Sequence, residues 1–343
     1  MSIKKRAYSA LGVLCPKKVR NKCLEFISSA MPIAFGVELT NICNARCSYC
    51  AYDFQKRKKG IMDDKVFEKA IDEYSIIGGG SINFTPTVGE PLLDLDIIKK
   101  IRYAINKKNI DNIWFYSNLI SLDKFDIDEL LTSGLTVLRI STCIKDSKTY
   151  QEIYGVDKYK TVLRNIVKVC ERNEQLKRPV NIKLYLRNHQ PCEDALNSED
   201  FRNISQYFDK KDLYIKDYKY DSWSGKIKDI DLPTGNVIHQ HNYDIMEEPC
   251  SELYRRIHVL YDGSVIFCVC RDLNGELKIG NIFEQGILDI WKGEKLKLLR
   301  LDWKRGNIPE LCKSCERYHP TSSFYNEQYK NLINKYFRYK FMN

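Results

Sequence analysis

The spacing of the cysteines constrains this chain more than any other feature of its sequence. The 343 residues contain 13 cysteines, several times what an ordinary intracellular enzyme of this length needs. Cys43, Cys47 and Cys50 form a C-x3-C-x2-C pattern. At this cysteine frequency such a pattern arises by accident with odds of about 0.02. Three explanations must be distinguished: a disulfide framework, zinc sites and iron–sulfur clusters.

The start of the chain bears on the disulfide explanation. A secretory signal needs an uninterrupted apolar stretch of about 7–15 residues after a basic start, but the stretch 7–14 contains Ser9 and Gly12. No window approaches the roughly 20 apolar residues that span a bilayer. We therefore expect no export signal and a cytoplasmic location. Thiols stay reduced in the cytoplasm, so this many cysteines indicate metal rather than disulfides.

Three closely spaced thiolates are one ligand short of a closed four-coordinate site. A cluster held by three cysteines keeps one iron open for a substrate or cofactor. On the residues alone, the alternative is a zinc site of three cysteines completed by a distant histidine. An aromatic residue, Tyr49, stands directly before the last cysteine, and an apolar strand-like run from Ile33 to Leu39 leads into the loop.

This cysteine loop resembles that of the radical S-adenosylmethionine (SAM) enzymes, in which C-x3-C-x-aromatic-C follows a first β-strand. The resemblance implies that Cys43, Cys47 and Cys50 hold a 4Fe–4S cluster whose open iron chelates the amino and carboxylate groups of SAM, and that Tyr49 borders the cofactor. It also implies the chemistry. One electron cleaves SAM to methionine and a 5′-deoxyadenosyl radical, which abstracts a hydrogen atom from the substrate.

The residues after the loop alternate between helical and extended patterns, as a β/α repeat does. Six or seven strands separated by helices predict an α/β fold. Its simplest form is an open or partial (β/α)6 TIM-like barrel, with the chemistry at the C-terminal ends of the strands. The expected strands are 33–39, 81–85, 112–116, 136–141, 180–186 and 212–217, and the expected helices are 63–77, 95–106, 127–133, 158–173 and 199–208.

Polar residues at the expected strand ends match further elements of the family. Gly89, Glu90 and Pro91 are similar to the Gly-Gly-Glu-Pro element that receives the amino group of SAM, with its first glycine replaced by valine here. Asn118 ends the third strand and Ser141 ends the fourth. The resemblance implies that these two side chains lie near the ribose or the carboxylate of SAM.

A second group of cysteines lies in the C-terminal third of the chain. Cys250 and Cys268 flank two alternating stretches, 258–261 and 264–269, joined by an Asp-Gly pair that favours a hairpin turn. Cys312 and Cys315 form a C-x2-C pair further on. On the residues alone, a zinc ribbon with four cysteine ligands is the alternative to an iron–sulfur cluster.

The arrangement resembles the C-terminal auxiliary-cluster extension of radical SAM enzymes, the SPASM domain, and its shortened relative, the twitch domain. This resemblance implies a second, fully coordinated 4Fe–4S cluster suited to electron transfer. Its expected ligands are Cys250, Cys268, Cys312 and Cys315, with Cys270 as a substitute. Five further cysteines match no motif, and the default interpretation is that they are buried structural thiols. They are Cys15, Cys23, Cys143, Cys170 and Cys192.

The motifs divide the chain into four parts. These are a basic N-terminal extension (1–32), the partial barrel (33–235), a small α+β auxiliary-cluster domain built on the hairpin (236–320) and a basic aromatic C-terminal helix (321–343). The 55 Lys+Arg against 45 Asp+Glu give a formal charge of +10. This surplus favours an anionic small-molecule substrate and an acidic electron donor of the flavodoxin or ferredoxin type. Peripheral membrane contact by the C-terminal segment is the less favoured interpretation, and nothing resembles a nucleic-acid-binding fold.

Family members with one auxiliary cluster include dehydrogenases that oxidise a secondary alcohol of a sugar or aminocyclitol. The resemblance therefore predicts a radical SAM oxidoreductase that takes a hydrogen atom from a carbohydrate-like substrate, whether a sugar, an aminocyclitol or a nucleotide-linked molecule. The auxiliary cluster takes up an electron. A peptide maturase or a sugar epimerase is the alternative, and a zinc-stabilised binding module is the non-enzymatic one. The catalytic candidates are Cys143, as a hydrogen donor, and Arg187, Tyr218 and Trp223, which follow the last two barrel strands.

Overall fold

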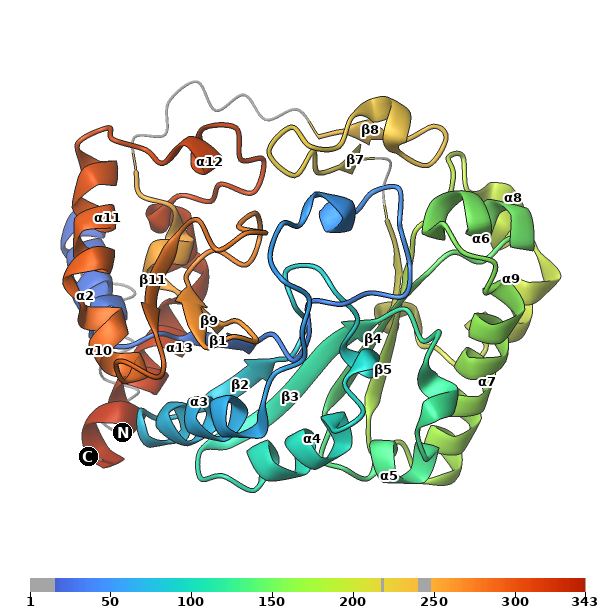
Figure 1. The fold of residues 1–343 in the computed structure, drawn as a ribbon, viewed down its shortest axis with the longest axis horizontal. Helices are drawn as coiled ribbons and strands as arrows, with labels where there is room; N and C mark the ends of the chain where they lie inside the picture. Colours follow the sequence, from blue (N-terminus) through green and yellow to red (C-terminus); the bar gives the residue numbers. More distant parts are fainter. Residues whose placement is uncertain (1–15, 217–218, 240–247, 343) are drawn as a thin grey trace.

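A single nine-stranded sheet organises the chain (Figure 1). The computed structural model describes residues 16–216, 219–239 and 248–342; Cys15 and Tyr218 lie outside them. The strand order is β11-β10-β9-β1-β2-β3-β4-β5-β6, and β1 to β6 run parallel to one another. These six strands are β1 (Ala34–Val37), β2 (Gly80–Asn83), β3 (Ile110–Ser117), β4 (Val137–Thr142), β5 (Asn181–Leu186) and β6 (Leu213–Ile215).

Helices between the strands cover the outer face of the sheet (Figure 1). They are α3 (Asp64–Ile76), α4 (Ile97–Ile105), α5 (Ile127–Leu131), α6 (Ser147–Tyr154), α7 (Tyr159–Gln175), α8 (Glu193–Leu196) and α9 (Glu199–Ser205). The alternation of β and α elements confirms the partial (β/α)6 barrel expected from the sequence. Strand and helix bounds differ from the expected ones by a few residues, because element ends fray and caps rather than periodicity set them.

The two faces of the sheet differ in what they bury. Ile113, Leu138 and Leu184 point towards the helices and have no exposed surface. Their neighbours along the strands point to the concave face, because side chains alternate along a strand. Trp114, Arg139 and other concave-face residues remain partly exposed. The sheet therefore has a dry outer core and a concave inner surface open to ligands.

The hairpin expected after Cys250 adds to the edge of the barrel sheet. Its strand β9 (Arg256–Val259) pairs in parallel with β1, from Ala34↔Arg256 to Val37↔Val259. Strand β10 (Ser264–Ile266) returns antiparallel to β9, and β11 (Lys278–Asn281) follows antiparallel to β10. The hairpin is thus continuous with the barrel, and a short parallel pair, β7 (Lys219–Tyr220) and β8 (Val237–Ile238), stands apart from it.

Helices from the two ends of the chain pack against each other beside β9 to β11 (Figure 1). Leu24 of α2 (Lys17–Ala30) joins Phe324 and Leu332 of α13 (Thr321–Met342) in a small apolar cluster. Three further helices complete this side of the molecule: α10 (Ile287–Lys292), α11 (Glu294–Lys304) and α12 (Glu310–Lys313). None of the described helices is long and apolar enough to cross a membrane.

A buried histidine on β9 makes the fold sensitive to acid. His258 has no exposed surface, and its two ring nitrogens find no hydrogen-bond partner among the described residues. It lies against Gly36 of β1, where a Cβ would stand 2.1 Å from the His258 Nδ1 atom. Glycine is thus required at this close approach. Burial, and then the charges of Arg256 and Arg57, lower the pKa of His258 to about 3.

We expect stability to fall as the pH falls from about 6.5 towards 3. In this window the unfolded chain binds a proton on His258 and the folded chain does not. The free energy of unfolding therefore falls by up to about 1.4 kcal/mol for each pH unit. Replacing His258 with leucine should remove this contribution. The check is the drop in thermal midpoint between pH 7.5 and pH 5.5, which should be smaller in the variant. Equal drops in both proteins would show that His258 is not the responsible group.

Candidate functional site

The first cysteine group lies on the loop after β1, above the C-terminal ends of the strands (Figure 1). The backbone N–H groups of Arg46 and Ser48 donate to Tyr154 and Ile153 at the end of α6, over 2.9 Å each, and hold the loop in place. The Cys50 N–H donates to the Cys47 carbonyl over 3.0 Å. A short 3-10 helix, η1 (Ala51–Phe54), follows.

The three thiols are close enough to influence one another electrostatically. Burial raises the pKa of Cys43 to about 12, with further contributions from Glu90 and Cys50. Burial raises the pKa of Cys47 well above its usual value, and Cys50 and Cys43 raise it further. Burial also raises the pKa of Cys50, to about 11. These raised pKa values disfavour the thiolate form, so three thiolates in this partly buried loop would need a cationic group among them, and this donor set fits an iron–sulfur cluster.

A buried ion pair braces the cysteine loop. Arg57 donates from Nη1 and Nη2 to the two carboxylate oxygens of Glu38, each over 2.7 Å, and from Nε to the Leu273 carbonyl over 2.8 Å. The side chain of Glu38 has no exposed surface and that of Arg57 has 9%. Burial raises the pKa of Glu38, although the Arg57 guanidinium opposes that rise. The pair ties the end of β1, the loop and the segment after Cys270 together.

The strand-end residues Glu90 and Asn118 form one hydrogen-bonded unit. Glu90 accepts from Ser117 Oγ over 2.7 Å and from the Asn118 N–H over 2.8 Å. Asn118 Nδ2 donates to Asn44 of the cysteine loop over 2.8 Å. Burial raises the pKa of Glu90 to about 7, against the hydrogen bonds that it accepts. Glu90 thus holds β3 beside the loop.

The segment around Gly89 comes close to the loop backbone. Gly89 has a φ of 144°, and a Cβ there would lie 2.7 Å from the Thr40 carbonyl oxygen, so a side chain does not fit. The backbone N–H of Glu90, directly before Pro91, donates to the Ile42 carbonyl over 2.8 Å. The Thr87 hydroxyl is buried and has no hydrogen-bond partner within the described part of the chain. An unpaired polar atom beside this turn fits a segment that receives a polar ligand such as SAM.

Aromatic residues and one arginine surround Tyr49. Its ring lies 5.9 Å from that of Tyr154 and 5.5 Å from that of Tyr220 between centroids. The Arg187 guanidinium lies 5.2 Å from the centroid of the Tyr49 ring. The Ser141 hydroxyl is 3.5 Å from the Tyr154 hydroxyl. The structure thus brings Tyr49, Ser141 and Arg187 into one neighbourhood.

Trp223 closes over the cysteine loop. Its indole N–H donates to the Tyr49 carbonyl over 3.1 Å, and it packs in a cluster with Cys50 and Leu273. Trp223 and Ser224 both have positive φ angles, 54° and 57°. Consecutive left-handed residues without glycine are costly and cluster at functional sites. The indole bond and the packing thus place Trp223 directly against the cysteine loop.

The second cysteine group also gathers in space. Burial raises the pKa of Cys268 well above its usual value, and the four cysteines near it raise it further: Cys270, Cys250, Cys312 and Cys315. Burial raises the pKa of Cys312 to about 12. The donor chemistry again fits a cluster of several iron atoms. Among the described residues, no three His, Cys, Asp or Glu side chains are grouped as they would be around a single metal ion.

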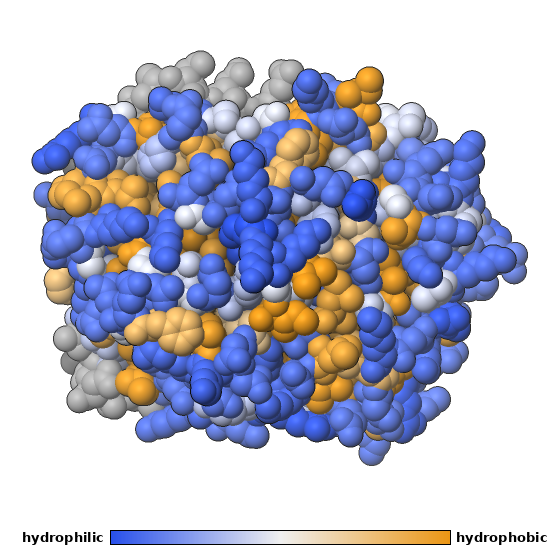
Figure 2. All heavy atoms as spheres, viewed as in Figure 1, coloured by the Kyte–Doolittle hydropathy of each residue, from blue (hydrophilic) through white to orange (hydrophobic). Residues whose placement is uncertain are grey.

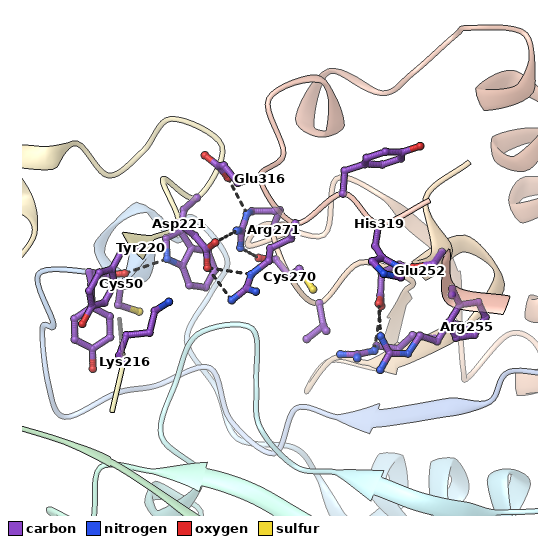
Figure 3. Close-up of a pocket in the computed structure, with 18 of the residues that line it drawn as sticks. Cys50, Lys216, Tyr220, Asp221, Glu252, Arg255, Cys270, Arg271, Glu316 and His319 are labelled. Atoms are coloured by element: carbon purple, nitrogen blue, oxygen red, sulfur yellow. Dashed lines mark hydrogen bonds and ion pairs between the residues drawn. The ribbon is translucent and has the colours of Figure 1, made fainter. Parts of the chain in front are cut away.

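A cavity of about 690 Å³ separates the two cysteine groups (Figure 3). Tyr49 and Cys50 line it on the side of the barrel, and Cys270 and Arg271 line it on the side of the second group. Arg187, at the end of β5, also lines it. Cys50 of the first group and Cys270, the substitute ligand of the second group, therefore border the same space.

The cavity walls carry more positive than negative charge. Arg271 pairs with Asp221 at 3.4 Å and with Glu316 at 3.5 Å, and Glu252 pairs with Arg255 at 3.1 Å. Figure 2 shows strongly hydrophilic residues gathered near the middle of this face of the molecule. The cationic lining residues are Arg187, Lys216, Arg255, Arg256, Arg271 and Arg317, against the carboxylates of Asp221, Glu252 and Glu316.

The remaining catalytic candidates lie in different places. Cys143 has no exposed surface and does not line this cavity. Arg187 and Trp223 do line it, whereas Tyr218 lies outside the described residues. Sequence reasoning missed the Glu38–Arg57 brace and the Arg271 cluster. The position of Arg271 directly after Cys270 is the one sequence signal that would have drawn attention to it.

Two family models match the chain. The model of the radical SAM superfamily matches residues 37–178, and that of the SPASM iron–sulfur cluster-binding domain matches residues 250–316. The chain is a radical SAM enzyme with a SPASM domain. The radical SAM domain implies SAM and a 4Fe–4S cluster as cofactors, and the SPASM domain implies additional iron–sulfur clusters. The radical SAM match contains the first cysteine group and the SPASM match contains the second.

Solved structures of radical SAM enzymes share this fold. BtrN in complex with AdoMet and 2-DOIA superposes with a TM-score of 0.55 at 20% identity, covering 84% of this chain and 94% of BtrN. Native anSMEcpe with bound AdoMet superposes with a TM-score of 0.52 at 18% identity, covering 89% and 97% of the two chains. At these identities the likeness shows the fold alone.

Curated relatives are GTP 3′,8-cyclases. That of Pasteurella multocida is 24% identical over 183 residues, which are 52% of this chain and 51% of the relative. That of Chlorobaculum tepidum is 29% identical over 126 residues, 37% of each chain. The chain thus spans about half or less of the length of the curated relatives it matches. The similarity covers only part of this chain and only part of each relative.

Proposed function

We propose that this radical SAM enzyme dehydrogenates a carbohydrate-like, anionic substrate in the cavity between its two cysteine groups. The observation that carries the proposal is the shared border of that cavity, with Cys50 on one wall and Cys270, two residues after Cys268, on another. A substrate held there lies between a site that starts radical chemistry and a site that takes up an electron.

The residues that would hold the cofactors follow from their placement. Cys43, Cys47 and Cys50 would hold the SAM-binding cluster, and Cys250, Cys268, Cys312 and Cys315 the auxiliary one. When bound, the first cluster supplies the electron that cleaves SAM to methionine and a 5′-deoxyadenosyl radical, and the second accepts one electron from the substrate. Tyr49, Gly89, Glu90, Pro91, Asn118 and Ser141 would border SAM. The chain would divide into the four parts expected from the motifs, namely 1–32, 33–235, 236–320 and 321–343.

Oxidation of a secondary alcohol balances on this arrangement. The carbinol carbon would lose one hydrogen atom to the 5′-deoxyadenosyl radical, the hydroxyl would pass its proton to a carboxylate of the cavity lining, and the remaining electron would pass to the auxiliary cluster, so that a ketone would form. Trp223, bonded to the Tyr49 carbonyl at 3.1 Å, would keep the cysteine loop closed over the reacting carbon. Water must be kept away from such a radical, and a capped cavity does this.

The charge of the cavity supports an anionic substrate. Arg187 forms no ion pair with a carboxylate among the described residues, and its Nε finds no hydrogen-bond partner there. A partly buried guanidinium that contacts tyrosine rings but no carboxylate favours an incoming carboxylate or phosphate. The GTP 3′,8-cyclases are named for a nucleotide, GTP. The negative charge of its phosphates would complement the cationic lining of the cavity. A flavodoxin- or ferredoxin-type protein would supply the first electron.

The decisive experiment follows deuterium. The anaerobically prepared enzyme should contain about eight irons per chain, and it should release 5′-deoxyadenosine when SAM and a reductant are added. With a candidate substrate deuterated at the carbinol carbon, deuterium should appear in 5′-deoxyadenosine together with a ketone product. Zinc without iron, or no 5′-deoxyadenosine from the reduced holoenzyme with any candidate, would defeat the proposal.

Epimerisation is the second candidate function, because a thiol faces the cavity. Cys270 lines it, next to Arg271, whereas Cys143 does not. A thiol on the cavity wall could return a hydrogen atom to the other face of a substrate radical, and the thiyl radical left on Cys270 would regain one electron from the reduced auxiliary cluster and one proton from solvent. An epimer carrying solvent deuterium, formed in D2O by the wild-type enzyme and not by Cys270→Ser, would favour epimerisation over dehydrogenation.

A further inference from the structure

Four aromatic rings contact one another in a row on the concave face of the barrel, two of the contacts edge-on and one stacked. The rings of Trp114 and Tyr116 on β3 lie 6.2 Å apart between centroids, and Tyr116 lies 5.0 Å from Tyr185 on β5. Tyr185 stacks on Tyr214 of β6 at 4.4 Å, with an interplanar angle of 3°. These four residues are called the aromatic platform below. All four are partly exposed, so the platform is not closed core.

One arginine of β4 stands on this platform. The Arg139 guanidinium lies 4.1 Å from the centroid of the Trp114 ring and 5.2 Å from that of Tyr116. Its Nη1 donates to the Tyr116 hydroxyl over 3.4 Å. Its Nε is buried without a hydrogen-bond partner, and no carboxylate of the described residues pairs with it. A cation held only by rings and a hydroxyl keeps its charge available to a ligand.

Two rings of the platform, Tyr185 and Tyr214, lie next to the cavity described above. Tyr185 and Tyr214 line a smaller cavity of about 290 Å³, and this cavity shares Arg187 and Lys216 with the larger one. Arg139 pairs in register with Lys183 of β5, four residues before Arg187. Four residues of strand span about 13 Å. Two arginines without carboxylate partners therefore stand about 13 Å apart along one strand direction, with tyrosine rings between them.

We propose that the aromatic platform and Arg139 bind the far end of a long anionic substrate, a nucleoside phosphate that is either free or linked to a sugar. The inference rests on the proposed function for the position of the reacting end near Tyr49. A single sugar ring placed there would not reach Arg139, whereas a nucleoside phosphate would. Its phosphate would meet the guanidinium of Arg139 or Arg187, and its rings would pack against Tyr185 and Tyr214, since sugar and base faces both pack on aromatic rings.

Equilibrium binding to the SAM-loaded holoenzyme tests this inference. The probes are GDP for a free nucleotide, UDP-glucose for a nucleotide-linked sugar, guanosine without phosphate, and glucose 6-phosphate without a base. GDP or UDP-glucose should bind about tenfold or more tightly than guanosine and glucose 6-phosphate. The tighter of the first two identifies the source of the nucleoside phosphate.

Variants test separately how much Arg139 and the aromatic rings contribute to binding. Arg139→Gln should weaken the preferred probe about tenfold or more, and Arg139→Lys should retain part of that affinity. Tyr214→Leu should weaken it as well, because the ring surface is lost. The matched control is Arg102→Gln on the outer face, where Arg102 makes a 3.7 Å ion pair with Glu129; it should leave the affinity unchanged.

Two results would overturn the inference. One is failure of both GDP and UDP-glucose to bind at about 1 mM. The other is binding that Arg139→Gln and Tyr214→Leu leave unchanged, which would show that the rings only pack the barrel. Binding does not require SAM cleavage. An enzyme that releases 5′-deoxyadenosine without binding these probes contradicts this inference alone, and one that binds them but cannot cleave SAM contradicts the proposed function alone.

Discussion

Replacing Cys47 with alanine should abolish the release of 5′-deoxyadenosine. Cys47 is the middle residue of the C-x3-C-x2-C group, and the other two thiols alone leave an incomplete ligand set. Iron should fall from about eight to about four per chain, because the second cysteine group keeps its cluster. Iron and sulfide assays, with chromatographic detection of 5′-deoxyadenosine after addition of SAM and dithionite, measure both effects.

The matched control for this variant is Cys23→Ala. Cys23 is exposed on α2 and belongs to neither group, so iron content and product release should equal those of the wild type. Cys312→Ala should instead lose the second set of irons and keep SAM cleavage. If Cys47→Ala retained all its iron, the assignment of this loop as the cluster site would be wrong.

Replacing Arg57 with alanine should cost about 3–5 kcal/mol of folding stability, because it leaves Glu38 buried and unpaired. Glu38 has no exposed surface and accepts two hydrogen bonds from the guanidinium, each over 2.7 Å. The loop that Arg57 ties to Leu273 should also loosen, so cluster content should fall together with stability. Chemical denaturation and iron content of the same preparations measure these two results.

Two further variants distinguish loss of the buried pair from loss of any charge. Lys99→Ala removes one partner of an ion pair between exposed side chains, Lys99 and Asp64, and should not change the thermal midpoint measurably. Joint replacement Glu38→Leu with Arg57→Met should recover most of the stability lost in Arg57→Ala, because no unpaired charge remains buried. A double variant as unstable as the single one would mean that Arg57 acts through its bond to Leu273.

The cysteine loop and the barrel could be predicted because both depend on patterns among residues that are close together in the sequence. Cys43, Cys47 and Cys50 lie within eight positions, so the covalent chain itself brings their sulfurs together. The strands and helices follow from the period of apolar residues, which depends on neighbours a few positions away. The hairpin between Cys250 and Cys268 has a local signal too, the Asp-Gly turn.

Other parts of the site have no such local signal. Arg57 stands in a basic run, Lys56 to Lys59, that looks like any solvated stretch, and its partner Glu38 lies 19 residues away. Cys143 follows a barrel strand as a pocket residue does, yet it packs into the core. Arg139 and Tyr185 alternate with apolar residues like any strand positions, and only the register between β4 and β5 brings them to one surface.

The sequence by itself indicated the kind of chemistry, because the C-x3-C-x2-C spacing, with Tyr49 directly before the last cysteine, resembles the cluster loop of radical SAM enzymes. It also determined the α/β class, through periodicity. The tertiary structure alone decided that β9 pairs with β1, which makes one sheet of two domains and places Cys270 opposite Cys50 across a single cavity. Strand pairing between residues more than 200 positions apart depends on burial and register summed over the whole sheet, and no short stretch of sequence contains that sum.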